Sequence, residues 1–249
     1  MQPLPEDKGL NGWGRLTHWV TLHQRIVRLI ILAVALVVII VIVPAHIRAV
    51  FWNGLKSNRL LTGMLLIFSA LAISLVWSVG QRLDAWMFLV FNLRGSRPIW
   101  LDRVMSGFTQ LGSGVATLGI ALAFLLAGDR LLAYKLALGT VTLWLVVELL
   151  KFGVHRSRPF ISLAQARIVG LRAIGRSFPS GHTSQVFFMA TLTAQHFHAS
   201  LWVVLLLYAI ALLVGITRMY VGAHYPRDVL AGAILGSAWG LLGTIVTGR

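Results

Sequence analysis

Three short polar segments in the second half of the chain carry residue types that could bind and cleave a phosphate ester. They read Lys151-x6-Arg158-Pro159, Pro179-Ser180-Gly181-His182 and Thr217-Arg218-x5-His224-x3-Asp228. Transfer of a phosphoryl group requires neutralisation of its equatorial oxygens, a nucleophile in line with the bond that breaks, and an acid for the leaving oxygen. Together the segments contain candidates for each of these parts.

Phosphate binding is expected from the cations and from a helix start. The fixed positive charges are those of Lys151, Arg158 and Arg218. The stretch from Ser180 to Thr183 is expected to open a helix. The first backbone amides of a helix lack carbonyl partners within it, so they would point at a bound anion.

The chemical steps are expected from two histidines and a carboxylate. His224 precedes Asp228 by four residues, so the carboxylate could orient the imidazole through a ring N–H if the helix extends back towards Tyr225. The other ring nitrogen would then be free to attack phosphorus. His182 would protonate the leaving oxygen and later activate water.

The remaining ionisable residues have simpler expected roles. Glu148, three residues before Lys151, is expected to be a structural partner that shields the lysine. Four arginines in and after the first segment are expected to be loop or headgroup-facing cations and not phosphate ligands: Arg156, Arg167, Arg172 and Arg176. Isolated histidines usually form ordinary hydrogen bonds at the interface, and this is the expectation for His18, His23, His46, His155, His196 and His198.

The composition is that of a membrane protein, with 57% hydrophobic and 12% charged residues. Apolar runs of about the length that crosses a bilayer recur along the chain. The net charge of +15 does not indicate nucleic-acid binding, because the basic residues lie in short connections between apolar spans. Absence of cysteine from the sequence excludes disulfides and thiolate chemistry.

The expected fold is an all-α, polytopic transmembrane bundle forming a single domain, residues 1–249. A polar tail, 1–24, carries Trp13 and Trp19 at the interface. Residues 48–59 form an interfacial turn, and 82–103 form a helix along the membrane surface. Seven spans are predicted, at about 26–47, 60–80, 107–127, 131–150, 181–198, 201–217 and 226–246. This number places the three polar segments on one side of the membrane.

The last predicted helix carries a stripe of small residues. Asp228, Gly232, Gly236 and Gly240 recur every four residues and share one face. Glycine lets a neighbouring helix approach closely. The stripe therefore predicts that Asp228 is held against the bundle.

Metal catalysis is disfavoured by the inventory of ligands. The seven acidic residues are too scattered to form a cage for a hard cation. A zinc site built from His182, His224 and Asp228 is conceivable, but it lacks a compact ligand motif. No metal and no cofactor is expected.

The three segments resemble the signature of the type 2 phosphatidic acid phosphatase superfamily, the lipid phosphate phosphatases: K-x6-R-P, P-S-G-H and S-R-x5-H-x3-D. Every defined position matches except Thr217, where the family usually has serine. The family core has six spans, expected here in residues 60–249, with an additional helix within 1–59. The resemblance implies His224 as nucleophile, His182 as acid and base, and Asp228 as orienter, with phosphate ligands Lys151, Arg158, Ser180, Gly181 and Arg218.

The function expected is metal-independent hydrolysis of a membrane lipid phosphate or pyrophosphate through a phosphohistidine. Phosphatidylglycerol phosphate, phosphatidic acid and undecaprenyl pyrophosphate are the candidate substrates. Two alternatives are a lipid phosphotransferase that uses the same intermediate, and a non-catalytic lipid-binding or transport protein. The side of the membrane with the three polar segments carries 16 Lys and Arg residues, and the other side carries 6. This excess alone would orient the catalytic side towards the cytoplasm. The resemblance to bacterial relatives instead implies an extracytoplasmic site in the cell membrane.

Overall fold

The computed structural model describes residues 34, 37–38, 41–42, 44–75, 77–93 and 98–245. The chain divides into two compact units, Met1–Ile42 and Val43–Arg249. The predicted tail 1–24 and most of the predicted span 26–47 lie outside the described residues, as do Arg94 and Arg97. The assignment of 1–249 to one domain stays a prediction.

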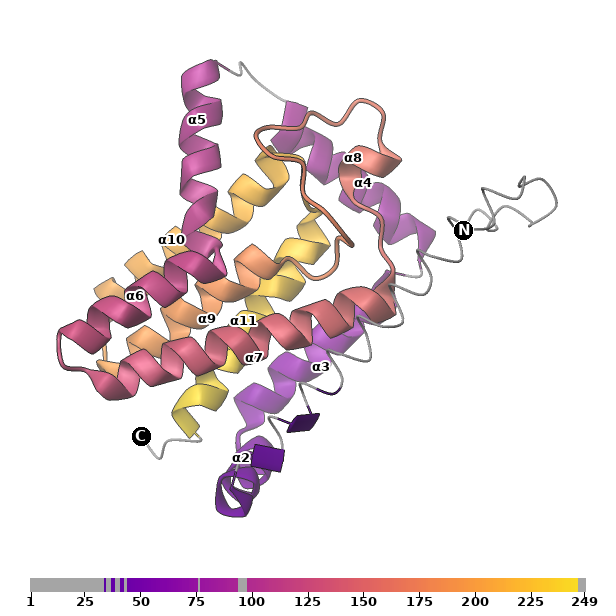
Figure 1. The fold of residues 1–249 in the computed structure, drawn as a ribbon. Coiled ribbons are helices and arrows are strands. Elements are labelled where there is room, and N and C mark those ends of the chain that lie inside the picture. Colours follow the sequence, from indigo (N-terminus) through magenta and orange to yellow (C-terminus); the bar gives the residue numbers. More distant parts are fainter. Residues whose placement is uncertain are drawn as a thin grey trace, which may run out of the picture. The chain divides into compact units, whose positions relative to one another are not determined.

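All regular elements in the described part of the second unit are helices, which confirms the predicted all-α class (Figure 1). They are α2 (Ala45–Ser57), α3 (Arg59–Ser74), α4 (Ser78–Leu93), α5 (Ile99–Phe108), the 3-10 turn η1 (Thr109–Gly112), α6 (Gly114–Leu126), α7 (Arg130–Val154), α8 (Pro159–Ser162), α9 (Gly181–His196), α10 (Leu201–Tyr220) and α11 (Pro226–Ile245).

Local sequence sets where several helices begin and end. Asn58, Ser113 and Asp129 each accept a hydrogen bond from the backbone N–H three residues on, which caps α3, α6 and α7 at their first turns. His155 adopts a left-handed backbone, with φ of 52°, and ends α7. Pro226 occupies the first position of α11, where its missing N–H costs nothing.

Helix α9 lies at the centre of the bundle, in contact with α7, α10 and α11 (Figure 1). Its Phe188 and Leu192 are buried in one apolar cluster with Leu143 of α7 and Leu235 of α11. On another face, Val186 packs in a second cluster with residues of α10. The start of α9 therefore has a fixed position relative to its three neighbours.

The glycine stripe of α11 packs against the backbone of α9, as predicted. A Cβ on Gly236 would lie 2.1 Å from the carbonyl oxygen of Ser184. On Gly232 it would lie 2.7 Å from the carbonyl oxygen of Ser180, and on Gly240 it would lie 3.0 Å from that of Phe188. Glycine is required for this close approach of the two helices.

Several helices are long and apolar enough to cross a membrane. Among the described residues these are the stretch Arg130–Ser162, α10 and α11. Two bent pairs pass the same test together: α3 with α4, at 97°, and Ile99–Gly112 with α6, at 60°. Up to five spans follow if each bent pair is one span. The predicted number of seven stays a prediction.

Three local expectations differ from the structure. The predicted interfacial turn 48–59 is largely the helix α2, because no proline interrupts the chain between Pro44 and the cap at Asn58. The predicted surface helix 82–103 falls within two helices, α4 and α5. The expected third span, 107–127, is not one straight helix: it covers the end of α5, a 3-10 turn in which Gly112 packs against the His182 backbone, and α6.

Candidate active site

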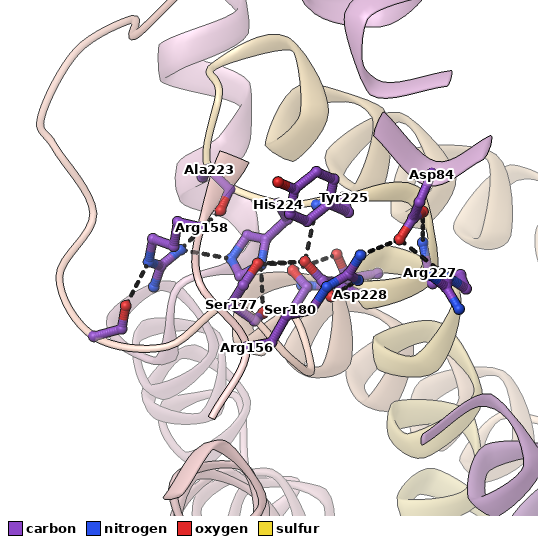
Figure 2. Close-up of polar contacts among 12 residues, drawn as sticks. Asp84, Arg156, Arg158, Ser177, Ser180, Ala223, His224, Tyr225, Arg227 and Asp228 are labelled. Atoms are coloured by element: carbon purple, nitrogen blue, oxygen red, sulfur yellow. Dashed lines mark hydrogen bonds and ion pairs between the residues drawn. The ribbon is translucent and has the colours of Figure 1, made fainter. Parts of the chain in front are cut away.

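The three polar segments meet at one end of the central helices (Figure 2). The first begins in the last turn of α7 with Lys151 and continues past it to Arg158. The second opens α9 at Ser180. The third runs from the last turn of α10 through the connection that carries His224 into the first turn of α11. A backbone hydrogen bond of 3.0 Å from the Ser180 N–H to the Asp228 carbonyl joins the second segment to the third.

His224 presents an unprotonated ring nitrogen to a guanidinium. Its Nδ1 lies 2.8 Å from the carbonyl oxygen of Ser177, which can only accept, so Nδ1 carries the hydrogen. Its Nε2 lies 3.2 Å from Nη1 of Arg158, which can only donate, so Nε2 has its lone pair available. Burial lowers the pKa of His224 to about 3, with the Arg158 and Arg218 charges acting in the same direction. The side chain is therefore a neutral base at neutral pH.

Asp228 is fully buried and reaches His224 indirectly. Oδ2 of Asp228 lies 3.7 Å from Nδ1 of His224, which is too long for a hydrogen bond. Instead, Oδ2 accepts from the Tyr225 N–H at 2.8 Å and from the Ser177 hydroxyl. Helix α11 begins at Pro226, so the expected extension back over Tyr225 does not occur. Ser177 thus contacts the carboxylate through its hydroxyl and the imidazole through its carbonyl.

Arg158 is buried and held by backbone oxygens. Its Nη1 donates to the Ala223 carbonyl at 3.0 Å, its Nε to Gly175 at 3.1 Å, and its Nη2 to Ile174 at 2.8 Å. These bonds fix the plane of the guanidinium beside His224. A cation held in this way needs little reorganisation when an anion arrives.

Two other predicted phosphate ligands, Lys151 and Ser180, lie at the start of α9. Lys151 pairs with Glu148 at 2.7 Å, the predicted partnership, and its Nζ lies 3.8 Å from where a Cβ on Gly181 would be. Ser180 is buried and caps α9 with its hydroxyl, which accepts from the Thr183 N–H at 3.4 Å.

Arg218 and His182 complete this group. Arg218 is buried and donates through Nη1 to the Thr109 hydroxyl at 2.8 Å, while its buried Nε has no hydrogen-bond partner among the described residues. The imidazole of His182 lies within electrostatic range of Arg218, His224, Lys151 and Arg158. The predicted site residues are thus brought together.

A cavity of about 210 Å³ adjoins this centre. Arg218 and Ala223 line it on the site side, and the loop residues Ile168 to Leu171 line it with Thr109 of η1. The cavity leaves open space next to the Arg218 cation.

Arg156 was expected to be a loop or headgroup-facing cation; it lies in the loop after α7, but its side chain faces the protein interior. Its guanidinium is mostly buried and pairs with Asp228, Nη1 to Oδ1, at 2.5 Å, and with Asp84 of α4 through Nη2. It also stacks on the ring of Tyr225, 4.2 Å from the centroid. Asp84 and Ser177 were missed as well. The spacing of Asp84, Phe88 and Asn92 was an available signal, because residues four apart share one face, and all three are buried.

Two further loop arginines also have protein partners. Arg167 forms a bidentate pair with Asp102, at 2.7 and 2.8 Å. Arg172 lies 4.7 Å from the centroid of the Phe160 ring. Both contacts fix the loop between α8 and α9, where Arg167 and Arg172 are loop cations with protein partners.

The zinc alternative does not take shape in the described part of the chain, where no group of three or more His, Asp and Glu is placed to hold a metal ion. The carboxylate of that hypothetical site, Asp228, instead accepts from Tyr225, Ser177 and Arg156.

Comparison with known proteins bears on the family of the chain. Residues 130–249 match the model of the PAP2 superfamily, so the chain carries a PAP2 superfamily domain. The resemblance expected from the three segments is thereby confirmed.

Among similar proteins, the phosphatidylglycerophosphatase B of Bacillus subtilis is 29% identical over 197 residues, which cover 73% of this chain and 89% of that one. The lipid A 1-phosphatase of Rhizobium johnstonii is 37% identical over 113 residues, and the match spans less than half of either protein, 42% of this chain and 43% of that one. A crystal structure of a transmembrane PAP2 type phosphatidylglycerolphosphate phosphatase from Bacillus subtilis superposes with a TM-score of 0.62 at 28% identity, covering 76% of this chain and 94% of that one. Together with its apolar helices, these relatives identify the chain as a multi-pass membrane protein.

Proposed function

We propose that this protein hydrolyses a membrane lipid phosphate or pyrophosphate through a phosphohistidine at His224, without a metal. The observation that carries the proposal is the unprotonated Nε2 of His224, buried against the Arg158 guanidinium where three cations converge. A neutral imidazole is a competent nucleophile. The adjacent positive charges would place a phosphorus atom in front of it.

In the first step, the Nε2 lone pair attacks phosphorus and the bond from phosphorus to the leaving oxygen breaks. His182, which takes up a proton when the anionic phosphate binds among the surrounding cations, gives that proton to the leaving oxygen, so a neutral alcohol or a protonated phosphate departs. Lys151, Arg158 and Arg218 would hold the equatorial oxygens as charge spreads onto them. The positive charge that grows on the His224 ring is stabilised by the Ser177 carbonyl at Nδ1 and by the nearby Asp228 carboxylate.

In the second step, water attacks the phosphohistidine. His182 accepts a proton from the water, the bond from phosphorus to Nε2 breaks, and inorganic phosphate leaves with His224 again neutral. Transfer to a second lipid would need an acceptor alcohol in place of this water. Release of phosphate without any acceptor lipid therefore separates hydrolysis from phosphotransfer.

The test is phosphate release in detergent from phosphatidylglycerol phosphate, phosphatidic acid and undecaprenyl pyrophosphate, with chelator and without added metal. We expect turnover of at least one of them, abolished in His224→Ala. The matched control is His196→Ala, at the far end of α9 and paired with Asp129 at 2.8 Å, which should retain activity. Loss of activity in chelator that one metal restores would overturn the metal-free mechanism, and activity in His224→Ala would overturn the nucleophile.

We further propose that the site faces the extracytoplasmic side of the cell membrane, as the resemblance to bacterial lipid phosphatases favours. The sequence contains no cysteine, and Leu171 in the loop beside the site is 97% exposed. A Leu171→Cys variant in intact cells should therefore react with a membrane-impermeant maleimide. Labelling only after the cells are opened would place the site on the cytoplasmic side.

A further inference from the structure

A carboxylate outside the three segments is tied into the site from helix α4. Asp84 is 2% exposed, and its oxygens accept from the Arg227 backbone N–H at 3.0 Å, from Arg227 Nε at 3.1 Å and from Arg156 Nη2. Arg227 lies in the first turn of α11, so Asp84 caps that helix from a neighbouring one. The two partners of Asp84 lie 72 and 143 residues away in the sequence.

Arg156 connects Asp84 to the proposed catalytic group. Its guanidinium binds the Asp228 carboxylate on its other side, and its backbone carbonyl accepts from the Ser177 N–H at 2.9 Å. Ser177 in turn holds Nδ1 of His224 and one oxygen of Asp228. A continuous set of hydrogen bonds therefore runs from Asp84 through Arg156 to both neighbours of the His224 ring (Figure 2).

We propose that Asp84 is a positioning residue for the reaction, acting through Arg156 on Asp228 and His224. This inference rests on the proposed function. Asp84 lies outside residues 130–249, the part of the chain that matches the family model. Helix α4, which carries Asp84, therefore helps to position the catalytic groups.

The electrostatic reason is charge balance around a buried carboxylate. Asp84 and Asp228 are matched by Arg156 and Arg227, so the four buried or half-buried charges sum to zero. Without the Asp84 charge, this cluster becomes net positive. A net positive cluster opposes the positive charge that develops on His224 during attack, yet it does not weaken binding of an anionic phosphate. The expected defect is therefore in the chemical step.

Asp84→Asn is the direct test, because asparagine keeps the size and one acceptor oxygen but not the charge. Single-turnover formation of the phosphoenzyme should slow by about tenfold or more, ~1.4 kcal/mol of transition-state stabilisation. KM should stay within about twofold of wild type. Arg156→Lys retains a positive charge but cannot bind the Asp84 and Asp228 carboxylates at the same time through one planar guanidinium. It should likewise lower kcat with little change in KM, and it replaces Asp84→Asn as the test if that variant does not fold.

The matched control is Asp129→Asn, which removes the carboxylate paired with His196 at the start of α7, the end away from Arg156. Its melting temperature should fall while its phosphorylation rate stays within about twofold of wild type. Unchanged phosphorylation in folded Asp84→Asn and Arg156→Lys would overturn the inference, as would a loss expressed mainly in KM. If wild type forms no phosphoenzyme and releases no phosphate, the proposed function itself has failed.

Discussion

Replacing Gly236 by alanine tests how closely the two helices that carry the site must pack. The added methyl group would lie 2.1 Å from the Ser184 carbonyl oxygen, 2.8 Å from its carbon and 3.0 Å from the Phe188 nitrogen. All three are backbone atoms of α9, so no side-chain rotation relieves the clash. The helices must move apart by about 1 Å to reach the closest tolerable contact.

The consequence should appear in both stability and activity. Inserting a methyl group into a close-packed contact costs about 1–3 kcal/mol, and each kcal/mol lowers the melting temperature by about 2–4 °C in a chain of this size. Helix α9 carries His182, and α11 follows directly after His224. A displacement of about 1 Å between reacting groups can reduce the rate by about 10²-fold.

The assay pairs thermal unfolding in detergent with kcat/KM on a long-chain lipid phosphate. Gly119→Ala is the matched control, because a Cβ at this position of α6 meets nothing within 4 Å and alanine favours the helix by about 1 kcal/mol. We expect the control to melt at or above the wild-type temperature with full activity. Wild-type melting and turnover in Gly236→Ala would refute the close packing of α9 on α11.

Three further predictions concern the chemistry. Stability should fall as the pH drops from 6.5 towards 3. The part due to His224 is about 2 kcal/mol at pH 5, because the unfolded chain protonates His224 at its ordinary pKa of 6.5 and the folded protein does not until about 3. Unfolding of His224→Gln in phosphate-free buffer should show a pH dependence smaller by this amount but not abolished, because the second histidine of the site, His182, contributes its own. Asp228→Asn should lose about 10²-fold in kcat, because the Ser177 carbonyl still orients the His224 ring in this variant. His224→Ala should lose more, ~10⁴-fold, and equal losses in the two variants would contradict the separate roles of the two residues. Long-chain substrates should exceed water-soluble phosphates in kcat/KM by about tenfold, ~1.4 kcal/mol, because the bilayer anchors their tails; equal efficiency in the same detergent would argue against lipid selectivity.

The parts of the site that sequence alone predicted depend on short-range spacing. A Pro-Ser-Gly-His turn marks the start of a helix through the capping preference of Ser180, and the structure has this cap. The spacing of the glycines on α11 requires a close neighbour on that face, and α9 fills this role. Apolar run lengths placed α7, α10 and α11 within a few residues of their observed bounds.

The parts that were missed depend on contacts between distant segments. Asp84 and Arg156 lie 72 residues apart, and in sequence each looks like an ordinary charge near a membrane surface. The position of Ser177 between His224 and Asp228 depends on the course of the loop after α8, which no periodicity describes. The spacing of four residues between His224 and Asp228 predicted a direct hydrogen bond from the imidazole to the carboxylate. Helix α11 begins at Pro226, after His224, so the two residues do not lie one turn apart on the same helix.

Attack of His224 Nε2 on phosphorus would leave a covalent phosphohistidine, and mapping this intermediate tests the proposed nucleophile. A single turnover with a lipid carrying a radiolabelled terminal phosphate would be stopped under alkaline, denaturing conditions, which preserve phosphohistidine, and the labelled peptide identified by mass spectrometry. We expect an acid-labile label on His224 that is absent from His224→Ala. A label on any other residue, or phosphate release with no labelled protein at any time point, would contradict it.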